Sequence, residues 1–423
     1  MTLKGAKVSH RSLTEWGVRA MLAITVGMCG YLAVADSVAT ALPKSGLPLA
    51  HRIAPWNARV AGALAREEMT EGAQLLSGKG SISAGHQRLA SAAVLARNAL
   101  RRDGTVVSAV TTLGMDAQIN ENVNVARGWF RYSESLSRRD LTTQLWMIED
   151  AVQRGDISQA LRHYDIALRT QPSAPDVMFP VLANAIGDPI VANGLVNILR
   201  QRRAWGPHFI SFIASNSDEP VAVERFFVAL RDIGVKVPND ASVALLDKLI
   251  ANGAYDEAWR YYAMGRPEVK RQRSRDADFS ALIPEPSELD WKTQSTAEGM
   301  VASIQPTGNG AEFSFSAPSN VGGEVLRQLQ LLTPGDYVLE GRSTQIEQTR
   351  GTSPYWRIVC LNNDHEIGQI DVPNSSVDNG RFSGELTIPD NCPAQKISLN
   401  IRASDESGGV TGQIVRVQVR PRN

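Results

Sequence analysis

A chain of 423 residues exceeds what one hydrophobic core usually organises, so its length predicts two or three domains. Lys plus Arg equals Asp plus Glu at 44 each, and this balance excludes proteins that attract nucleic acid through a large positive charge. We therefore expect no nucleic-acid partner.

The first 42 residues differ in character from the rest of the chain. Basic residues precede an apolar run, residues 20–35, that carries no charge; they are Lys4, Lys7, Arg11 and Arg19. Residues 16–36 have about the 20 positions needed to cross a bilayer. The positive-inside rule places the basic tail in the cytoplasm, which predicts a single-pass membrane anchor with everything after Asp36 on the outer side. The alternative is a secreted or periplasmic protein, cleaved at the A-x-A pattern that ends at Ala35.

The residue pattern of positions 51–268 predicts a region of helices. Apolar residues recur there at helical spacing, with frequent short breaks and no sustained alternation. Two stretches 34 residues apart carry similar residue types at matching offsets, which predicts a repeat. The later stretch has Gly155, Ala160, Tyr164, Ala167 and Pro172, and the earlier one has Leu113, Gly114, Ala126 and Phe130, with Ser133 at the offset of Ala167. Small side chains at these offsets let two helices approach closely, while the aromatic rings cover the seam with the next pair.

This spacing resembles the tetratricopeptide repeat. The resemblance implies a solenoid of helix pairs whose first helices line a concave groove for peptides or partner domains. Carried over by position, the groove would present Ser108, Thr111, Met115 and Gln118 from one repeat, and Thr142, Leu145, Glu149 and Gln153 from the next. The earlier repeat has Arg138 where the later one has Pro172, and the spacing fails after Pro172, so a generic antiparallel helix bundle is the alternative.

The composition of residues 269–287 predicts a linker. This stretch contains prolines and a basic run, Lys270, Arg271, Arg273 and Arg275. We expect the basic run to be solvated, with contact to anionic lipid or an acidic glycan as the alternative.

Residues 288–423 change from helical periodicity to short apolar runs at period two, separated by Gly, Pro, Asn and Asp. This pattern predicts an antiparallel β-sandwich of about eight strands. The fold class is therefore multidomain α + β, with one N-terminal transmembrane helix. Cys360 and Cys392 both lie in this exported region, which predicts a disulfide, whereas Cys29 lies in the apolar segment; two buried thiols are the alternative.

In outline the sandwich resembles the jelly-roll carbohydrate-binding modules of secreted proteins. The resemblance implies an aromatic platform for sugar, and the candidates are Trp291, Tyr355 and Trp356, with Arg357, Asn362, Asp364 and Glu366 as polar partners. Trp356 alternates with Ile358 and Cys360, which favours burial. We expect one of the three aromatic side chains to be exposed.

No catalytic motif is present in the sequence. The patterns of zinc proteases, serine hydrolases, P-loop proteins and dinucleotide-binding proteins are absent, and none of the six His residues has a neighbour at metal-ligand spacing. We predict no catalytic residues, no metal and no cofactor.

The combined parts are similar to accessory factors of bacterial exopolysaccharide or envelope assembly. The resemblance implies an anchor in a bacterial inner membrane, with the bulk of the protein in the periplasm. We therefore predict a non-enzymatic, membrane-anchored envelope scaffold that binds envelope proteins through the helical groove, with polysaccharide as a further partner. One alternative is a secreted glycan-binding protein that acts through the sandwich. Another is a glycan-active enzyme whose carboxylates converge in a cleft between the helices and the sandwich.

Overall fold

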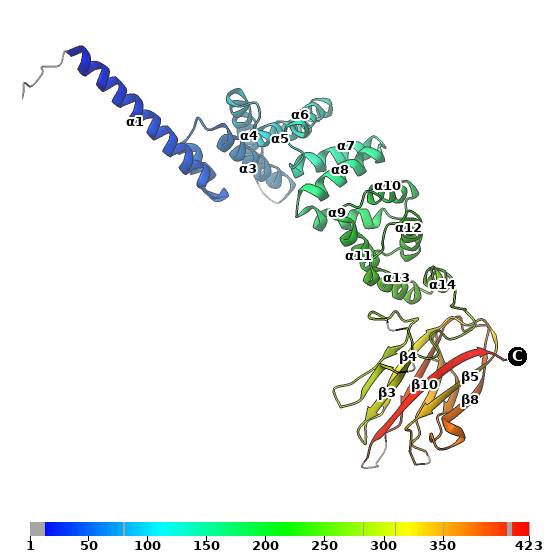
Figure 1. Cartoon of the computed structure of the whole chain (residues 1–423). Coiled ribbons are helices and arrows are strands. Elements are labelled where there is room, and N and C mark those ends of the chain that lie inside the picture. Colours follow the sequence, from blue (N-terminus) through cyan, green and yellow to red (C-terminus); the bar gives the residue numbers. More distant parts are fainter. Residues whose placement is uncertain are drawn as a thin grey trace, which may run out of the picture. The chain divides into compact units, whose positions relative to one another are not determined.

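The computed structural model describes residues 13–78, 81–281, 283–308, 310–349, 351–403 and 408–422 (Figure 1). The predicted tail residues Lys4, Lys7 and Arg11 lie outside these ranges. The chain divides into two compact units, residues 1–174 and residues 175–423.

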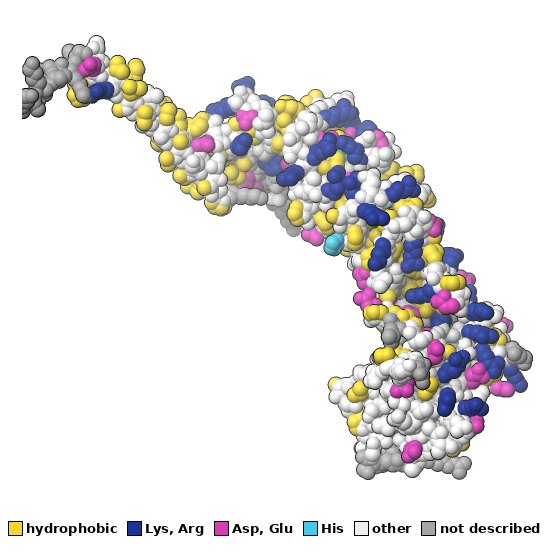
Figure 2. Space-filling view, in the orientation of Figure 1, with side chains coloured by type: hydrophobic (Ala, Val, Ile, Leu, Met, Phe, Trp, Pro, Cys, Tyr) yellow, Lys and Arg dark blue, Asp and Glu magenta, His cyan; other side chains and the backbone are white. Residues whose placement is uncertain are grey.

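The first unit begins with a long apolar helix, α1 (Leu13–Ala41). Hydrophobic side chains cover its free surface in Figure 2, and Met21 and Val26 are 72% and 70% exposed. This much apolar surface is unfavourable in water, and the helix is long enough to cross a membrane. A membrane anchor and an export signal share these properties. The end of α1 is covered, because Ala35 and Ala39 are buried and Ala39 packs with Ala50, Ala54 and Val60.

In the described residues of the first unit seven further α-helices follow, and neighbours in the chain pack as hairpins. They are α2 (Leu47–Ile53), α3 (Ala58–Ser77), α4 (Ile82–Arg102), α5 (Val107–Ile119), α6 (Val123–Leu136), α7 (Leu141–Gln153) and α8 (Ile157–Thr170). The pairs are α3 with α4, α5 with α6 and α7 with α8, and α3 also packs against α5. Asp140 and Asp156 cap the last two helices by accepting hydrogen bonds from Thr143 N and Gln159 N.

The residues predicted to form the repeat core lie at helix contacts or helix ends. Leu113, Gly114, Ala126, Phe130, Ala160 and Ala167 are buried, and Tyr164 is half-buried. Gly155 has a φ of 72° in the turn between α7 and α8, a conformation that glycine adopts without strain. Pro172 follows the last residue of α8 by two positions.

In the described residues the second unit starts with six α-helices and continues into a sandwich. The helices are α9 (from Ala174 to Asn184), α10 (Pro189–Leu199), α11 (Gly206–Asn216), α12 (Pro220–Asp232), α13 (Asn239–Ala251) and α14 (Tyr255–Ala263). Proline occupies an early helical position in α10, α11 and α12, where the missing N–H costs nothing.

Two five-stranded antiparallel sheets form the sandwich. One sheet has the order β1-β4-β9-β6-β7 and the other the order β2-β3-β10-β5-β8. The strands are β1 (Lys292–Thr293), β2 (Val301–Thr307), β3 (Gly310–Ala317), β4 (Gly323–Gln330), β5 (Gly335–Thr344), β6 (Tyr355–Cys360), β7 (Glu366–Asp371), β8 (Arg381–Ile388), β9 (Gln395–Ile401) and β10 (Val410–Pro421). Inward side chains of both sheets, Phe313, Leu339, Trp356 and Leu399 among them, form one hydrophobic core.

The sequence pattern did not predict β4. A register shift between Glu324 and Leu326 interrupts its alternation, and Gln328 and Gln330 are buried where alternation alone favours apolar residues. The pattern also did not predict the two-residue strand β1, so the structure has ten strands in the described residues where the pattern predicted about eight.

The predicted linker, residues 269–287, differs most from its expectation, because its middle belongs to the sandwich. Ser274 exchanges hydrogen bonds with Val419, and Phe279 is fully buried in the sandwich core. Arg275 is buried and donates to the carbonyl oxygens of Leu289 and Leu329. The basic run is thus not uniformly solvated: backbone carbonyls at the edge of the sandwich need donors, and Arg275 supplies them.

Candidate functional site

The first candidate site is a cleft between α3 and α5, which we call the α3–α5 cleft. It has a volume of about 430 Å³. Its side chains include Arg66, Met69, Thr70, Gln74, Thr111 and Met115. Thr70 and Gln74 are exposed at the rim, whereas Met69 is buried and supplies apolar surface. A flexible thioether adapts its shape to different side chains, so this lining suits a peptide better than a small polar molecule.

A buried polar network, the polar seam, forms one side of the cleft and joins four helices. Asp140 Oδ1 accepts from Arg66 Nη2 at 2.6 Å, and Asp140 Oδ2 accepts from Thr143 Oγ1 at 2.7 Å and from Thr111 Oγ1 at 3.2 Å. Ser133 Oγ lies 2.7 Å from Thr143 Oγ1. Because a buried carboxylate is stable only when paired and hydrogen-bonded, the seam fixes α3, α5, α6 and α7 together.

Arg66 is the charged group of the seam that also reaches the cleft. Its side chain is 39% exposed, while Asp140 is 6% exposed. The buried Nε–H of Arg66 has no acceptor among the described residues. This buried donor without a partner costs free energy, whereas the exposed part of the Arg66 side chain can donate to an acceptor that a ligand brings.

The side chains predicted for a groove have different environments. Thr111 is 2% exposed because α5 is covered by α3 and α4, and its hydroxyl belongs to the polar seam. Gln118 Oε1 accepts from Trp146 Nε1 at 3.0 Å. Ser108 and Thr142 are half-buried, and the exposed pair Glu149 and Gln153 share a hydrogen bond of 2.9 Å.

Of the predicted groove positions, Thr111 and Met115 line the α3–α5 cleft. The prediction missed Arg66, Thr70 and Gln74 because the 34-residue spacing did not extend to residues 58–77. The helical periodicity of residues 58–77 is the sequence signal that could have placed these side chains on a helix.

The second candidate site lies inside the second unit, where the end of α14 and residues 266–284 meet the sandwich. This junction hollow has a volume of about 640 Å³. Its lining includes carboxylates, an arginine and aromatic rings: Tyr262, Arg266, Asp276, Asp278, Asp290 and Trp291. The guanidinium of Arg266 lies 4.1 Å from the centroid of the Tyr262 ring.

The deepest carboxylates of the junction hollow are already engaged. Asp290 accepts from Tyr262 Oη at 2.6 Å and from Ser287 Oγ at 2.6 Å. Burial raises the pKa of Tyr262, so the phenol remains a donor. Asp276 accepts from Ala281 N at 3.0 Å, and burial raises the pKa of its carboxyl. These bonds hold residues 276–290 in place, whereas Asp278 is exposed at the rim.

Two of the three aromatic residues predicted to contact glycan are inside the sandwich. Trp356 is fully buried, and Trp291 is 6% exposed with its Nε1 donating to Asp276 O. Their ring centroids are 5.9 Å apart in the core. Strand β6 turns Trp356 toward the facing sheet, so neither ring is a platform for a dissolved sugar.

Tyr355 is half-buried, and the guanidinium of Arg402 lies 4.2 Å from its ring centroid. It is the one aromatic side chain in the described residues of 288–423 that is not buried. Two of the predicted polar partners, Arg357 and Glu366, pair with each other at 2.8 Å, and Asn362 Nδ2 donates to Asn391 O.

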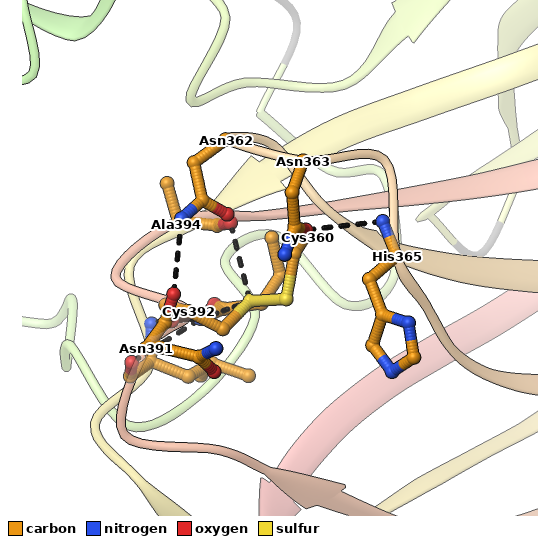
Figure 3. Close-up of a disulfide and its surroundings, with 9 residues drawn as sticks. Cys360, Asn362, Asn363, His365, Asn391, Cys392 and Ala394 are labelled. Carbon is orange, nitrogen blue, oxygen red and sulfur yellow. Dashed lines mark hydrogen bonds between the residues drawn. A yellow bond between two sulfur atoms is a disulfide. The ribbon is translucent and has the colours of Figure 1, made fainter.

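Figure 3 shows the predicted disulfide between Cys360 and Cys392, which the structure confirms. The bond joins the end of β6 to the turn before β9, and the Cα atoms are 5.5 Å apart. Beside it, Cys360 N donates to His365 O at 2.9 Å and closes the turn of residues 361–365. A disulfide favours an extracytoplasmic location for this domain. Among the described residues no group of three or more His, Cys, Asp or Glu side chains is arranged to hold a metal.

No protein-family model matches the chain, and no curated protein matches it. Among solved structures, the chain is similar over 36% of its length to tailspike protein 4 of bacteriophage CBA120, an enzymatically active domain, at 16% identity and a TM-score of 0.24. That match spans 21% of the tailspike chain, so the chain covers about a fifth of this relative.

Two carbohydrate-binding modules of the CBM6 type are also similar. One belongs to lichenase 5A of Cellvibrio mixtus, in complex with cellotriose. The match has 10% identity, covers 32% of this chain and 98% of the module, and has a TM-score of 0.21. The other is the C-terminal module of a laminarinase from Zobellia galactanivorans. That match has 13% identity, covers 28% of this chain and 87% of the module, and has a TM-score of 0.19. The description of the sandwich rests on its two sheets rather than on these likenesses.

Proposed function

We propose that this protein is a non-enzymatic, membrane-anchored scaffold of a bacterial envelope, and that its first unit holds a protein partner in the α3–α5 cleft. The observation that carries this proposal is the composition of the cleft. It combines thioether walls with a partly exposed arginine that has an unsatisfied donor.

Three further features support the proposal. The apolar helix α1 precedes the hairpins, and the disulfide of the sandwich favours an oxidising compartment. The tetratricopeptide-like spacing of residues 113–172 implies helix pairs that present a groove to peptides. Together these features support an arrangement in which the chain is held at the membrane and its hairpins and sandwich are on the outer side.

The partner that fits the cleft is an extended peptide segment. An apolar side chain of the peptide packs on Met69 and Met115, and a carbonyl or carboxylate oxygen accepts from Arg66. Backbone approach is possible because Thr70 and Ala73, one turn apart on α3, have short side chains.

Site-specific photocrosslinking in cells tests this proposal. A photoreactive amino acid at Thr70 or Gln74 is expected to give a defined protein adduct, and the same probe at Ser91, which is exposed on α4, is expected to give none. Gln74→Arg should reduce the adduct formed at Thr70 several-fold, because it fills the cleft. Equal adducts at Ser91 and Thr70, or no adduct at either cleft position, would count against the scaffold.

Glycan binding at the junction hollow is the second candidate function. The observation that favours it is the combination of carboxylates, Arg266 and aromatic edges in one hollow, since sugars are bound by polar groups beside rings. The test is calorimetric titration of the full chain with acidic and neutral oligosaccharides, with Asp278→Ala as the site variant. Binding that this variant weakens supports the candidate; binding that it leaves unchanged places the sugar elsewhere. We expect no release of reducing ends in the same mixtures, as a non-enzymatic protein requires.

A further inference from the structure

The last part of α1 is fixed to the loop that leads into α3. Asn57 Nδ2 donates to Asp36 Oδ1 at 2.6 Å, and the ring centroids of Tyr31 and Trp56 are 6.3 Å apart. Ala39 packs with Ala50 and Ala54. The first hairpin therefore cannot be lifted away from α1 without breaking these contacts.

This attachment determines how deep the loop lies when α1 spans a membrane. The uncharged run ends at Ala35, and Asp36 marks the point where the chain leaves the hydrocarbon. Tyr31 precedes Asp36 by five residues, or about 7 Å of helix. Trp56 lies against Tyr31 and is 37% exposed, so the fold brings it to the headgroup level, where Trp and Tyr side chains are enriched.

Three exposed arginines surround this loop. Arg52 precedes it, Arg59 follows it, and Arg102 at the end of α4 donates from Nη1 to the carbonyl oxygen of Pro55. Among the described residues none of the three has a carboxylate partner within 4 Å. Two carboxylates lie near the loop: Asp36, which accepts from Asn57, and Asp103, whose pKa is lowered by hydrogen bonds from Thr105 and by the charge of Arg59. The loop thus combines an interfacial tryptophan with unpaired cations, the composition that anionic lipid surfaces attract.

We propose that Arg52, Trp56, Arg59 and Arg102 form a juxtamembrane patch that docks on the headgroups of anionic phospholipids and seats the first unit against the outer surface of the membrane. This inference rests on the proposed function in one respect, the retention of α1 as an anchor. It goes further, because it makes the lipid surface a partner of the hairpins as well as of α1.

The test uses the full chain reconstituted into nanodiscs of phosphatidylcholine, with or without phosphatidylglycerol. Cys29→Ser removes the free thiol, and Pro55→Cys carries a nitroxide whose accessibility to oxygen and to a water-soluble nickel chelate reports its depth. We expect the label to be oxygen-accessible and protected from nickel in the anionic discs. Replacing Arg52, Arg59 and Arg102 with Glu should raise its nickel accessibility several-fold in those discs.

A matched control changes the same charge elsewhere in the first unit. Replacing Arg131, Arg138 and Arg139 with Glu alters three exposed arginines for which no ion pair is present among the described residues, and it should leave the label unchanged. A water-exposed label in both lipids, or equal effects of the two triple variants, overturns the patch. Alkaline extraction of the same discs separates the two ideas: a chain that is extracted contradicts the anchor, whereas a retained chain with a water-exposed label contradicts the patch alone.

Discussion

Asp140 is the residue at which the contacts of the polar seam converge. Its carboxylate caps α7 and accepts from Arg66 and Thr111 in a place that is almost closed to water. Asp140→Ala removes the cap and leaves the buried donors unpaired, so we expect a loss of about 2 to 4 kcal/mol in the stability of the first unit. Hydrogen exchange of the amides in α5 to α7 measures it. Asp140→Asn keeps an acceptor for Thr143 N and should lose less; a wild-type exchange profile for Asp140→Ala would show that the seam is dispensable.

We expect His163 to make the stability of the first unit sensitive to acid. The ring is buried, its Nδ1 lies 2.8 Å from Gln144 Oε1, and burial lowers its pKa below the ordinary value of 6.5, with Arg162 adding to the effect and Glu134 opposing it. The unfolded chain therefore binds a proton before the folded chain does. Stability is fully present above pH 6.5 and falls as the pH decreases below it, by at most about 1.4 kcal/mol per pH unit.

His163→Gln isolates this contribution, because glutamine does not titrate. Denaturant unfolding of both proteins between pH 8 and pH 5 should show a difference in stability that shifts in favour of the variant as the pH falls. A pH-independent difference would mean that His163 stays neutral in both states.

At the scale of elements, α5 and α6 approach each other closely at Gly114. A Cβ added there would lie 2.9 Å from the ring of Phe130, which is fully buried. Gly114→Ala is expected to destabilise the hairpin by about 1 to 3 kcal/mol through overpacking.

Gly128 supplies a control in the same hairpin, since a Cβ at this exposed position of α6 meets nothing within 4 Å. Gly128→Ala should stabilise the helix by about 0.5 to 1 kcal/mol. Thermal unfolding followed by circular dichroism measures whether each substitution raises or lowers the stability. Equal effects of the two substitutions would disprove the close approach.

The disulfide is an element-scale constraint on the sandwich. It links residues that are 32 positions apart and joins β6 to the approach of β9. Replacing Cys360 and Cys392 with Ser should lower the stability of the sandwich by about 2 to 5 kcal/mol, mainly because the unfolded chain gains conformational entropy without the bond. Urea unfolding monitored by tryptophan fluorescence, with and without reductant, checks this. Cys29→Ser is the control and should change nothing, because Cys29 lies exposed on α1.

At the scale of the whole molecule, the central prediction is that α1 is retained. The full-length protein should resist alkaline carbonate extraction from membranes, and intact mass measurement should give the uncleaved chain. The physical reason is that α1 carries enough apolar surface to remain in a bilayer. Soluble protein whose N-terminus is residue 36 would instead establish the secreted alternative.

Part of this organisation was predictable from particular residues. The uncharged run of residues 20–35 predicted α1, and Gly155 and Pro172 marked a helix turn and a helix end that the structure contains. Cys360 and Cys392 predicted the disulfide. Apart from the cysteine pair, which the residue type and its exported setting indicated, these signals are local: a positive φ, a missing N–H or an apolar run acts within a few residues, so one sequence contains the information.

Other features depended on which elements cover each other. The position of Thr111 on its helix gave no indication that α3 would lie across it, and Arg275 looked like part of a solvated basic run until the carbonyls of Leu289 and Leu329 enclosed it. The alternation of Trp356 favoured burial, but the burial of Trp291 depends on Phe279, which arrives from the predicted linker.

The sequence by itself therefore determined the kinds of element, their order along the chain, the apolar N-terminal helix and the paired cysteines. Only the tertiary structure decided where open surface remains: the cleft between α3 and α5, the junction hollow, and the arginines around Trp56. The reason is that periodicity fixes which side of an element is apolar, whereas contacts between residues distant in the chain fix which neighbour covers that side and which polar groups stay without a partner.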